Sequence, residues 1–333
     1  MKAAKSRPPA CYRAPWWLPG GHLQTLYAYF AALGTVRFRR ERWETDDGDF
    51  IDLDWTQTQA APSRLVVLLH GLEGCSRSHY AVNLMRELAR RGWGGVVAHF
   101  RGCSGENNRL ARAYHSGDTG EVDWLMGRLR RLLPAARLHA VGVSLGGNVL
   151  LKWLGEQGDR AAPTVASAAA VSAPVDLTVA VSVLDRGWNR LLYTRHFLGS
   201  LKKKTAAKIA VHGLELDPAA LKAASTFREF DALYTAPVHG FESAEQYWRV
   251  SSSKPYLKSI AVPTLMINAR NDPFFPASSL PGPEEVSGVV TLEYPAAGGH
   301  AGFVSGPFPG HLRWLPRRIV RFFAETGGGP GNR

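Results

Sequence analysis

From residue 65 onward, short apolar runs alternate with segments whose apolar residues recur at helical spacing, and this alternation constrains the fold most. Residues 65–69 (LVVLL) are continuously apolar, as expected of a strand buried on both faces of a parallel sheet. Residues 80–91 follow with helical spacing, and 95–100 read as the next strand. The same alternation predicts strands at 138–143, 165–171, 263–269 and 288–294, and helices at 122–133, 145–154 and after Pro316. The pattern therefore predicts an α/β fold with a mostly parallel central sheet flanked by helices and joined by right-handed crossovers.

The remaining segments divide the chain into parts of a single domain. Residues 1–34 are aromatic and interrupted by proline and glycine, so we expect an irregular N-terminal arm packed on a core. Residues 35–44 and 50–55 alternate like two antiparallel strands joined by a turn at 46–48. The core is expected at 35–173 and 261–326, with a helical cap insertion at 174–260 and a mobile tail at 327–333.

Charge and composition bear on partners and location. The formal net charge is +12, but the basic residues are spread along the chain and no nucleic-acid module accompanies them, so we expect no nucleic-acid partner. The charge leaves peripheral contact with a membrane open, and the sequence does not give the oligomeric state. No apolar run approaches the roughly 18 residues that span a bilayer. The start of the chain lacks the apolar region of a secretory signal, so we expect a cytoplasmic protein.

The chemistry centres on Gly142-Val143-Ser144-Leu145-Gly146, a G-x-S-x-G motif. The pattern alone is short, but here it stands between an apolar strand and an amphipathic helix. In that context the serine occupies a sharp turn that projects its hydroxyl above the sheet, and the following helix directs its N-terminus toward it. Ser144 is therefore predicted to be a nucleophile.

A serine hydroxyl needs a base, and the base needs an acid that orients it. His300 follows the last predicted strand in a loop of small residues, and Asp272 follows the strand before it. The chain order Ser144, Asp272, His300 is that of α/β-hydrolases. Asp176 is an alternative acid, and Asp272 could instead form an Asx turn ahead of Pro273.

An oxyanion in the transition state needs two N–H donors. The N–H of Leu145, directly after the nucleophile, is expected to be one. The other is expected from Leu72, in the loop His70-Gly71-Leu72-Glu73-Gly74 after the first buried strand. His70 is expected to support this loop rather than to act as a second base. The sequence indicates no cofactor and no metal ligand set.

These motifs together resemble the YheT-like branch of the α/β-hydrolases, also called the AB hydrolase 4 family. Further matching segments are 21–26 (GHLQTL), 100–105 (FRGCSG), 114–119 (YHSGDT), 226–231 (TFREFD) and 271–274 (NDPF). The family often has a second Asp where Asn271 stands, a departure that spares Asp272. The resemblance implies a carboxylic-ester hydrolase, with relatives that act on short acyl esters and on lipids.

Residues and resemblance together predict a serine carboxylic-ester hydrolase that forms an acyl-enzyme. A small-molecule ester, with a short- to medium-chain acyl group or lipid-like, is the expected substrate. The aromatic residues of the cap segment would line an apolar acyl pocket or simply form the core of the cap. Acyl transfer, thioester hydrolysis or lipase activity by the same residues is the alternative, and a non-catalytic binding protein on this fold is a third.

Overall fold

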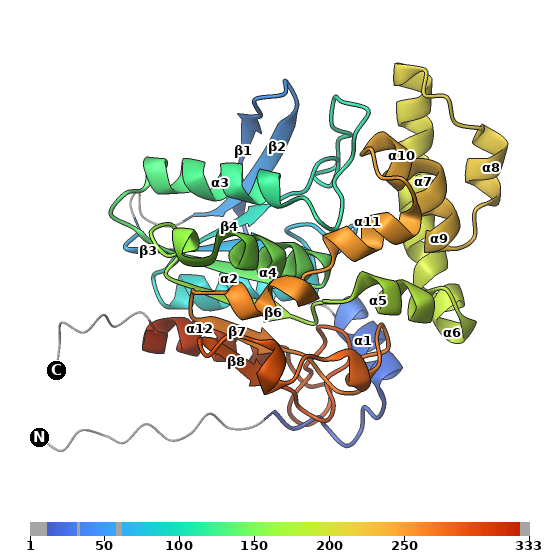
Figure 1. Ribbon diagram of the computed structural model, residues 1–333. Coiled ribbons are helices and arrows are strands. Elements are labelled where there is room, and N and C mark those ends of the chain that lie inside the picture. Colours follow the sequence, from blue (N-terminus) through green and yellow to red (C-terminus); the bar gives the residue numbers. More distant parts are fainter. Residues whose placement is uncertain (1–11, 32–33, 58–61, 327–333) are drawn as a thin grey trace, which may run out of the picture.

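In the computed structural model, residues 12–31, 34–57 and 62–326 of the chain are described, and their strands form one eight-stranded sheet of order β1-β2-β4-β3-β5-β6-β7-β8 (Figure 1). Neighbours from β4 to β8 are parallel, whereas β2 runs antiparallel to both β1 and β4. The strands are β1 Phe38–Glu44, β2 Phe50–Thr56, β3 Arg64–Leu69, β4 Gly94–Ala98, β5 Arg137–Val143, β6 Ser167–Val171, β7 Thr264–Ile267 and β8 Val290–Glu293. The predicted mostly parallel sheet is confirmed.

Two helical layers cover the sheet because successive side chains of a strand point to opposite faces. In β3, Leu65, Val67 and Leu69 pack in one core with the helices α3 and α4. Val66 and Leu68 pack in a second core with α2 and α12. These four helices are α2 His79–Arg90, α3 Thr119–Leu132, α4 Leu145–Gln157 and α12 Trp314–Thr326. Continuous apolar strands are therefore required here, since both faces are buried.

The segment between β6 and β7 is helical, as predicted, and Figure 1 shows most of it grouped to one side of the sheet. Its elements are α5 Leu177–Leu184, α6 Gly187–Asn189, the π-helical turn η2 Arg190–Thr194, α7 Arg195–His212, α8 Pro218–Ala223, α9 Phe227–Phe230, the π-helical turn η3 Asp231–Thr235, α10 Ala236–Val238, α11 Ala244–Ser251 and η4 Lys254–Ser259. Buried residues of α5, η2, α7, α8, α9 and η3 form one core, which Phe274 and Phe275 of the sheet domain join. Tyr234 also ties these helices to the sheet domain by donating its hydroxyl to the Ala111 carbonyl at 2.7 Å.

The prediction of an irregular N-terminal arm is wrong for residues 21–30, which form the helix α1 (Gly21–Phe30). Gly20 and Gly21 are among the glycines that predict an interruption of this arm. Gly21 instead begins the helix where only a glycine fits, because a Cβ atom there would lie 1.9 Å from the Asn271 carbonyl oxygen. The predicted mobile tail at 327–333 and residues 1–11 of the arm lie outside the described residues.

Among the helices of residues 12–31, 34–57 and 62–326, none is both long enough and apolar enough to cross a bilayer.

Candidate active site

Ser144 stands in the sharp turn between β5 and α4 that the G-x-S-x-G motif predicts. Its backbone has φ 54° and ψ −121°, a conformation that an L-residue adopts only when its surroundings enforce it. The Ser144 N–H donates to the Val171 carbonyl at 2.8 Å, which ties the turn to the end of β6. A Cβ atom at Gly142 would lie 2.3 Å from the Gly146 oxygen, and one at Gly146 would lie 2.4 Å from the Leu69 oxygen. The two glycines of the motif are therefore required by close backbone contacts.

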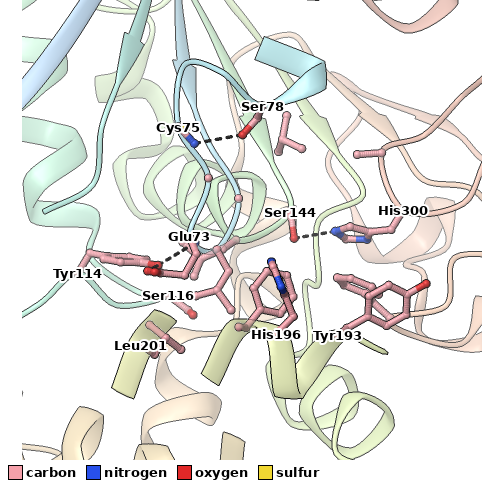
Figure 2. A pocket seen from close by; sticks show the side chains of 18 of the residues that line it. Glu73, Cys75, Ser78, Tyr114, Ser116, Ser144, Tyr193, His196, Leu201 and His300 are labelled. Atoms are coloured by element: carbon pink, nitrogen blue, oxygen red, sulfur yellow. Dashed lines mark hydrogen bonds between the residues drawn. The ribbon is translucent and has the colours of Figure 1, made fainter. Parts of the chain in front are cut away.

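The three residues that the sequence selected meet at the carboxyl edge of the sheet. The Ser144 Oγ lies 2.8 Å from the His300 Nε2 (Figure 2). On the other side of the ring, the His300 Nδ1 lies 2.9 Å from Asp272 Oδ2 and 3.1 Å from Oδ1. An ionised carboxylate only accepts hydrogen bonds, so Nδ1 carries the proton and Nε2 is free to accept the serine proton. This tautomer is the one that a general base needs.

The loop that carries His300 is held by α1, a contribution that the sequence analysis missed. The Thr25 Oγ1 accepts the His300 N–H at 2.8 Å, and the Gln24 Oε1 accepts the Gly298 N–H at the same distance. Asn271 Nδ2 also donates to Gln24 Oε1, at 3.1 Å, and Asn271 Oδ1 accepts from the backbone of the same loop. Gln24 and Thr25 belong to the GHLQTL segment of the family resemblance. The resemblance therefore marked this segment but did not indicate that it supports the His300 loop.

Further contacts fix the imidazole from the other side. The His79 Nε2 donates to the Ala301 carbonyl at 3.0 Å, and the Ala301 N–H donates to the Ser172 Oγ at 3.0 Å. Burial lowers the pKa of His79 to about 4, which keeps its ring neutral beside His300. Phe274 stacks on the His300 ring with centroids 3.8 Å apart and covers one of its faces.

Asp272 combines the two roles that the sequence analysis set against each other. One carboxylate oxygen accepts the Phe274 N–H at 2.9 Å, as in an Asx turn, while both oxygens face His300. The alternative acid, Asp176, does not approach His300 but caps α5 by accepting the Val179 N–H at 3.1 Å. Geometry therefore favours Asp272.

The two expected oxyanion donors flank the serine. Leu145 is the first residue of α4, and Leu72 lies in the loop after β3, where a Cβ atom on the adjacent Gly71 would be 3.2 Å from Ser144 Cβ. Among the described residues, neither the Leu72 N–H nor the Leu145 N–H has a hydrogen-bond acceptor. The Gly146 N–H donates to the His70 carbonyl at 3.1 Å and so locks this loop to α4. Both N–H groups are therefore available to a substrate oxygen.

His70 supports the loop, as expected. Its Nδ1 donates to the Gly71 carbonyl at 2.8 Å, and its Nε2 accepts the Phe100 N–H at 3.1 Å. Burial lowers the pKa of His70 to about 3, so the ring stays neutral and fully engaged with backbone.

Glu73, next to Leu72, connects this loop to the cap and was not predicted. Its backbone has φ 54°, and its carboxylate accepts the Tyr114 hydroxyl at 2.8 Å (Figure 2). The ammonium of Lys204, on α7, lies 2.8 Å from the same carboxylate, and the Ser200 hydroxyl also donates to it. The buried carboxylate thereby joins the expected oxyanion loop to a cap helix.

Above Ser144 lies a cavity of about 1030 Å³ between the sheet domain and the cap. Figure 2 shows Tyr193, His196 and Leu201 of the cap on the side of the cavity across from Ser144. Of the cap aromatics singled out in the sequence, those that line the cavity are Tyr193, Phe227, Phe230, Tyr234 and Trp248. Most of them also belong to the core of the cap, so the same aromatic residues both line the cavity and form that core. Trp188 does neither and is exposed.

A doubly covered parallel sheet with a strained serine turn at its carboxyl edge defines the α/β-hydrolase class. A family model described as "alpha/beta hydrolase fold" matches residues 64–307, and the chain belongs to this family.

Within the family, the chain is 42% identical to the protein YheT of Escherichia coli (strain K12) over 283 residues, which cover 84% of this chain and 82% of that protein. The resemblance to the YheT-like branch is thereby confirmed. The chain is also 28% identical to phospholipase ABHD3 of Homo sapiens, over 93% of this chain and 78% of that protein. Medium-chain fatty acid ethyl ester synthase/esterase 2 of Saccharomyces cerevisiae is 30% identical, over 78% of this chain and 62% of that protein.

Solved structures agree on the fold at low identity. The esterase Pf2001 of Pyrococcus furiosus superposes with a TM-score of 0.57 at 16% identity, over 89% of this chain and 98% of that one. Est1E of Butyrivibrio proteoclasticus gives a TM-score of 0.54 at 14% identity, over 86% of this chain and 98% of that one. The relatives support a hydrolase of the esterase type.

Proposed function

We propose that the protein is a serine carboxylic-ester hydrolase in which Ser144 is the nucleophile, His300 the general base and Asp272 the acid that orients it. The single observation that carries the proposal is the continuous hydrogen-bonded line from Ser144 Oγ through both ring nitrogens of His300 to the Asp272 carboxylate. This line orients the His300 ring so that Nε2 faces the serine hydroxyl and Nδ1 faces the carboxylate, which is the arrangement that proton transfer requires.

In the proposed reaction, the Ser144 Oγ attacks the ester carbonyl carbon while its proton passes to His300 Nε2. The N–H groups of Leu72 and Leu145 stabilise the resulting oxyanion, each by a few kcal/mol, on the order of 10²–10³ in rate. The C–O bond to the alcohol then breaks, and His300 returns the proton to the leaving oxygen. Water attacks the acyl-enzyme with His300 again as base, and the acid leaves as the Ser144 hydroxyl is restored.

The cavity supports acyl or lipid-like esters as substrates. About 1030 Å³ is more than a short acyl chain fills, and most of the cap residues that line it are aliphatic or aromatic. The charged cap residues in the lining, Lys204, Lys208 and Asp231, are already bound to Glu73, to the Leu110 carbonyl and to Trp248. Two relatives carry names that refer to a phospholipase and to a medium-chain fatty ester, which agrees with this substrate class.

The test compares Ser144→Ala with Ser116→Ala, since Ser116 lines the same cavity but accepts its hydrogen bond from Tyr247. We expect Ser144→Ala to lose hydrolysis of p-nitrophenyl acyl esters and labelling by a fluorophosphonate probe, while Ser116→Ala keeps both. Wild-type turnover by Ser144→Ala would refute the assignment. A panel of acyl chain lengths then defines the preferred ester.

A second reaction, acyl transfer to an alcohol, uses the same residues and is favoured by one observation. The yeast relative is named as both a synthase and an esterase of fatty acid ethyl esters. Here an alcohol replaces water in the second half of the reaction. Measuring ester product against free acid at rising ethanol concentration separates the two, and free acid as the sole product would exclude transfer.

A further inference from the structure

Exposed apolar side chains gather at the edge of the cavity on two neighbouring helical segments. Six of the twelve large apolar side chains that are exposed among the described residues lie on α1 and on the continuous α6–η2 segment. We call this set the apolar rim; it consists of Leu23, Tyr29, Phe30, Trp188, Leu191 and Leu192. Trp188 and Phe30 are the most open, at 73% and 75% exposed.

The two segments of the rim lie side by side. His22 of α1 stacks on Tyr193 of η2 with ring centroids 5.8 Å apart, and its Nδ1 lies 3.1 Å from the Tyr193 hydroxyl. At the other end of α1, the rings of Tyr29 and His196 meet edge to face at 6.0 Å. Figure 1 shows α1 and α6 close together on the same side of the molecule. The rim is therefore one surface and not two scattered groups.

The rim also opens into the cavity. Tyr29, Phe30 and Leu192 are exposed and at the same time line the cavity, which places them where it meets the surface. Trp188 and Leu191 do not line the cavity but belong to the same helical segment as Leu192. Trp188 lies about one turn before Leu192, and Leu191 directly precedes it. An ester that enters between α1 and η2 passes this rim first.

The charge along the cap side of the rim is mostly positive, although Asp185 lies directly before Arg186 and interacts electrostatically with Arg190. Residues 186–213 contain seven Lys or Arg and no Asp or Glu, and α1 contains no charged residue. Arg186, Arg190 and Arg195 are exposed, and no carboxylate of the described residues forms an ion pair with them. Aromatic and aliphatic side chains surrounded by arginine are the composition of a surface that inserts between anionic lipid headgroups.

We propose that the apolar rim docks on an anionic lipid surface, with Trp188 and Leu191 inserted among the lipids and the three arginines on the headgroup phosphates. The proposal deepens the proposed function, since docking would present lipid-like esters directly to the cavity. Lipid is favoured over a protein partner because three exposed arginines, without an ion pair among the described residues, stand on the same segment as Trp188, Leu191 and Leu192, and each contributes about fivefold to binding near an anionic surface.

The test is sedimentation of the full chain with vesicles of phosphatidylcholine, with and without phosphatidylglycerol. We use Ser144→Ala as the parent protein, so binding is measured without hydrolysis and its result does not depend on the catalytic assignment. We expect binding to the phosphatidylglycerol vesicles that salt weakens. Trp188→Ser combined with Leu191→Ser should reduce binding at least tenfold, as should replacement of the three arginines by Gln.

The matched control is Leu132→Ser, because Leu132 is 55% exposed at the end of α3, away from the rim. It should bind vesicles like the parent protein. With Ser144 restored, Trp188→Ser with Leu191→Ser should hydrolyse a soluble short-chain ester at the wild-type rate. The proposal is overturned if the parent does not bind, or if the rim and control variants bind equally. It is also overturned if the protein is a dimer that Trp188→Ser dissociates, since the rim would then be a contact between two copies.

Discussion

The bond between Thr25 and the backbone of His300 tests whether α1 takes part in catalysis. Thr25 Oγ1 accepts the His300 N–H at 2.8 Å, and both residues are only 8% exposed. Thr25→Val keeps the shape of the side chain but removes the acceptor for the His300 N–H, together with the bond of 2.7 Å that the hydroxyl donates to the Gly21 carbonyl within α1.

The magnitude follows from the burial of the amide. A buried N–H left without an acceptor costs about 1–3 kcal/mol, and water reaches this site poorly, so we expect the free energy of unfolding to fall by that amount. The loop relaxes to find another partner and carries the imidazole with it. A displacement of about 1 Å at a catalytic group costs up to 10²-fold in rate. We therefore expect kcat to fall about 10- to 100-fold with KM little changed.

The assay combines urea unfolding with kcat and KM for a soluble p-nitrophenyl ester. Thr25→Ser is the control, because it keeps the hydroxyl and loses one methyl group, a change of about 0.8 kcal/mol. It should retain most of the activity. If Thr25→Val is less stable but turns over at the wild-type rate, the bond has only a structural role. Equal loss in both variants would contradict a specific role of the acceptor, because Thr25→Ser keeps the hydroxyl.

Three further predictions concern the acid, the loop and the cap. Asp272→Asn should lower kcat about 10⁴-fold while the protein stays folded, because an amide no longer holds His300 in the required tautomer; near-wild-type turnover would contradict this. Lys204→Met leaves the buried Glu73 carboxylate without its ion pair and should lower the free energy of unfolding by about 1–3 kcal/mol, with recovery in Lys204→Arg; equal stability of the two variants in urea would speak against it. Burial raises the pKa of Asp231 from 3.8 to about 6, so the native state binds more protons than the unfolded state between these values. Stability from this group is therefore lost as pH rises through that window, by about 3 kcal/mol, and Asp231→Asn should flatten the profile of thermal unfolding against pH; parallel profiles for variant and wild type would refute it.

Much of the site could be predicted from the sequence because its chemistry is local to the ends of strands. Gly142 of the G-x-S-x-G turn is required by a contact with the Gly146 oxygen four residues later, and the backbone of Ser144 adopts the strained conformation that such a turn imposes. Gly146 is required by the more distant Leu69 and His70 oxygens of the loop after β3. Asp272 and His300 follow predicted strands, and parallel strands bring their carboxyl ends to one edge. Chain order and strand ends therefore predicted Ser144 and His300 and limited the acid to Asp272 or Asp176, and the geometry favours Asp272.

The supports of the site could not be predicted, because they join segments far apart in sequence through single side chains. Glycines at the start of α1 predict a break, but Gly21 is required by the carbonyl of Asn271, some 250 positions later. Glu73 gives no periodic signal, and its role arises only when α7 brings Lys204 to it.

Apolar periodicity and strand-end motifs along the chain predicted the layers of the fold and the candidate catalytic residues, since both patterns depend on near neighbours. Only the tertiary structure decided how the His300 loop is held, which aromatics of the cap line the cavity and which, like Trp188, face outward. Those outcomes depend on which surfaces meet after folding, because the spacing of residues in one segment does not specify which distant segment packs against it.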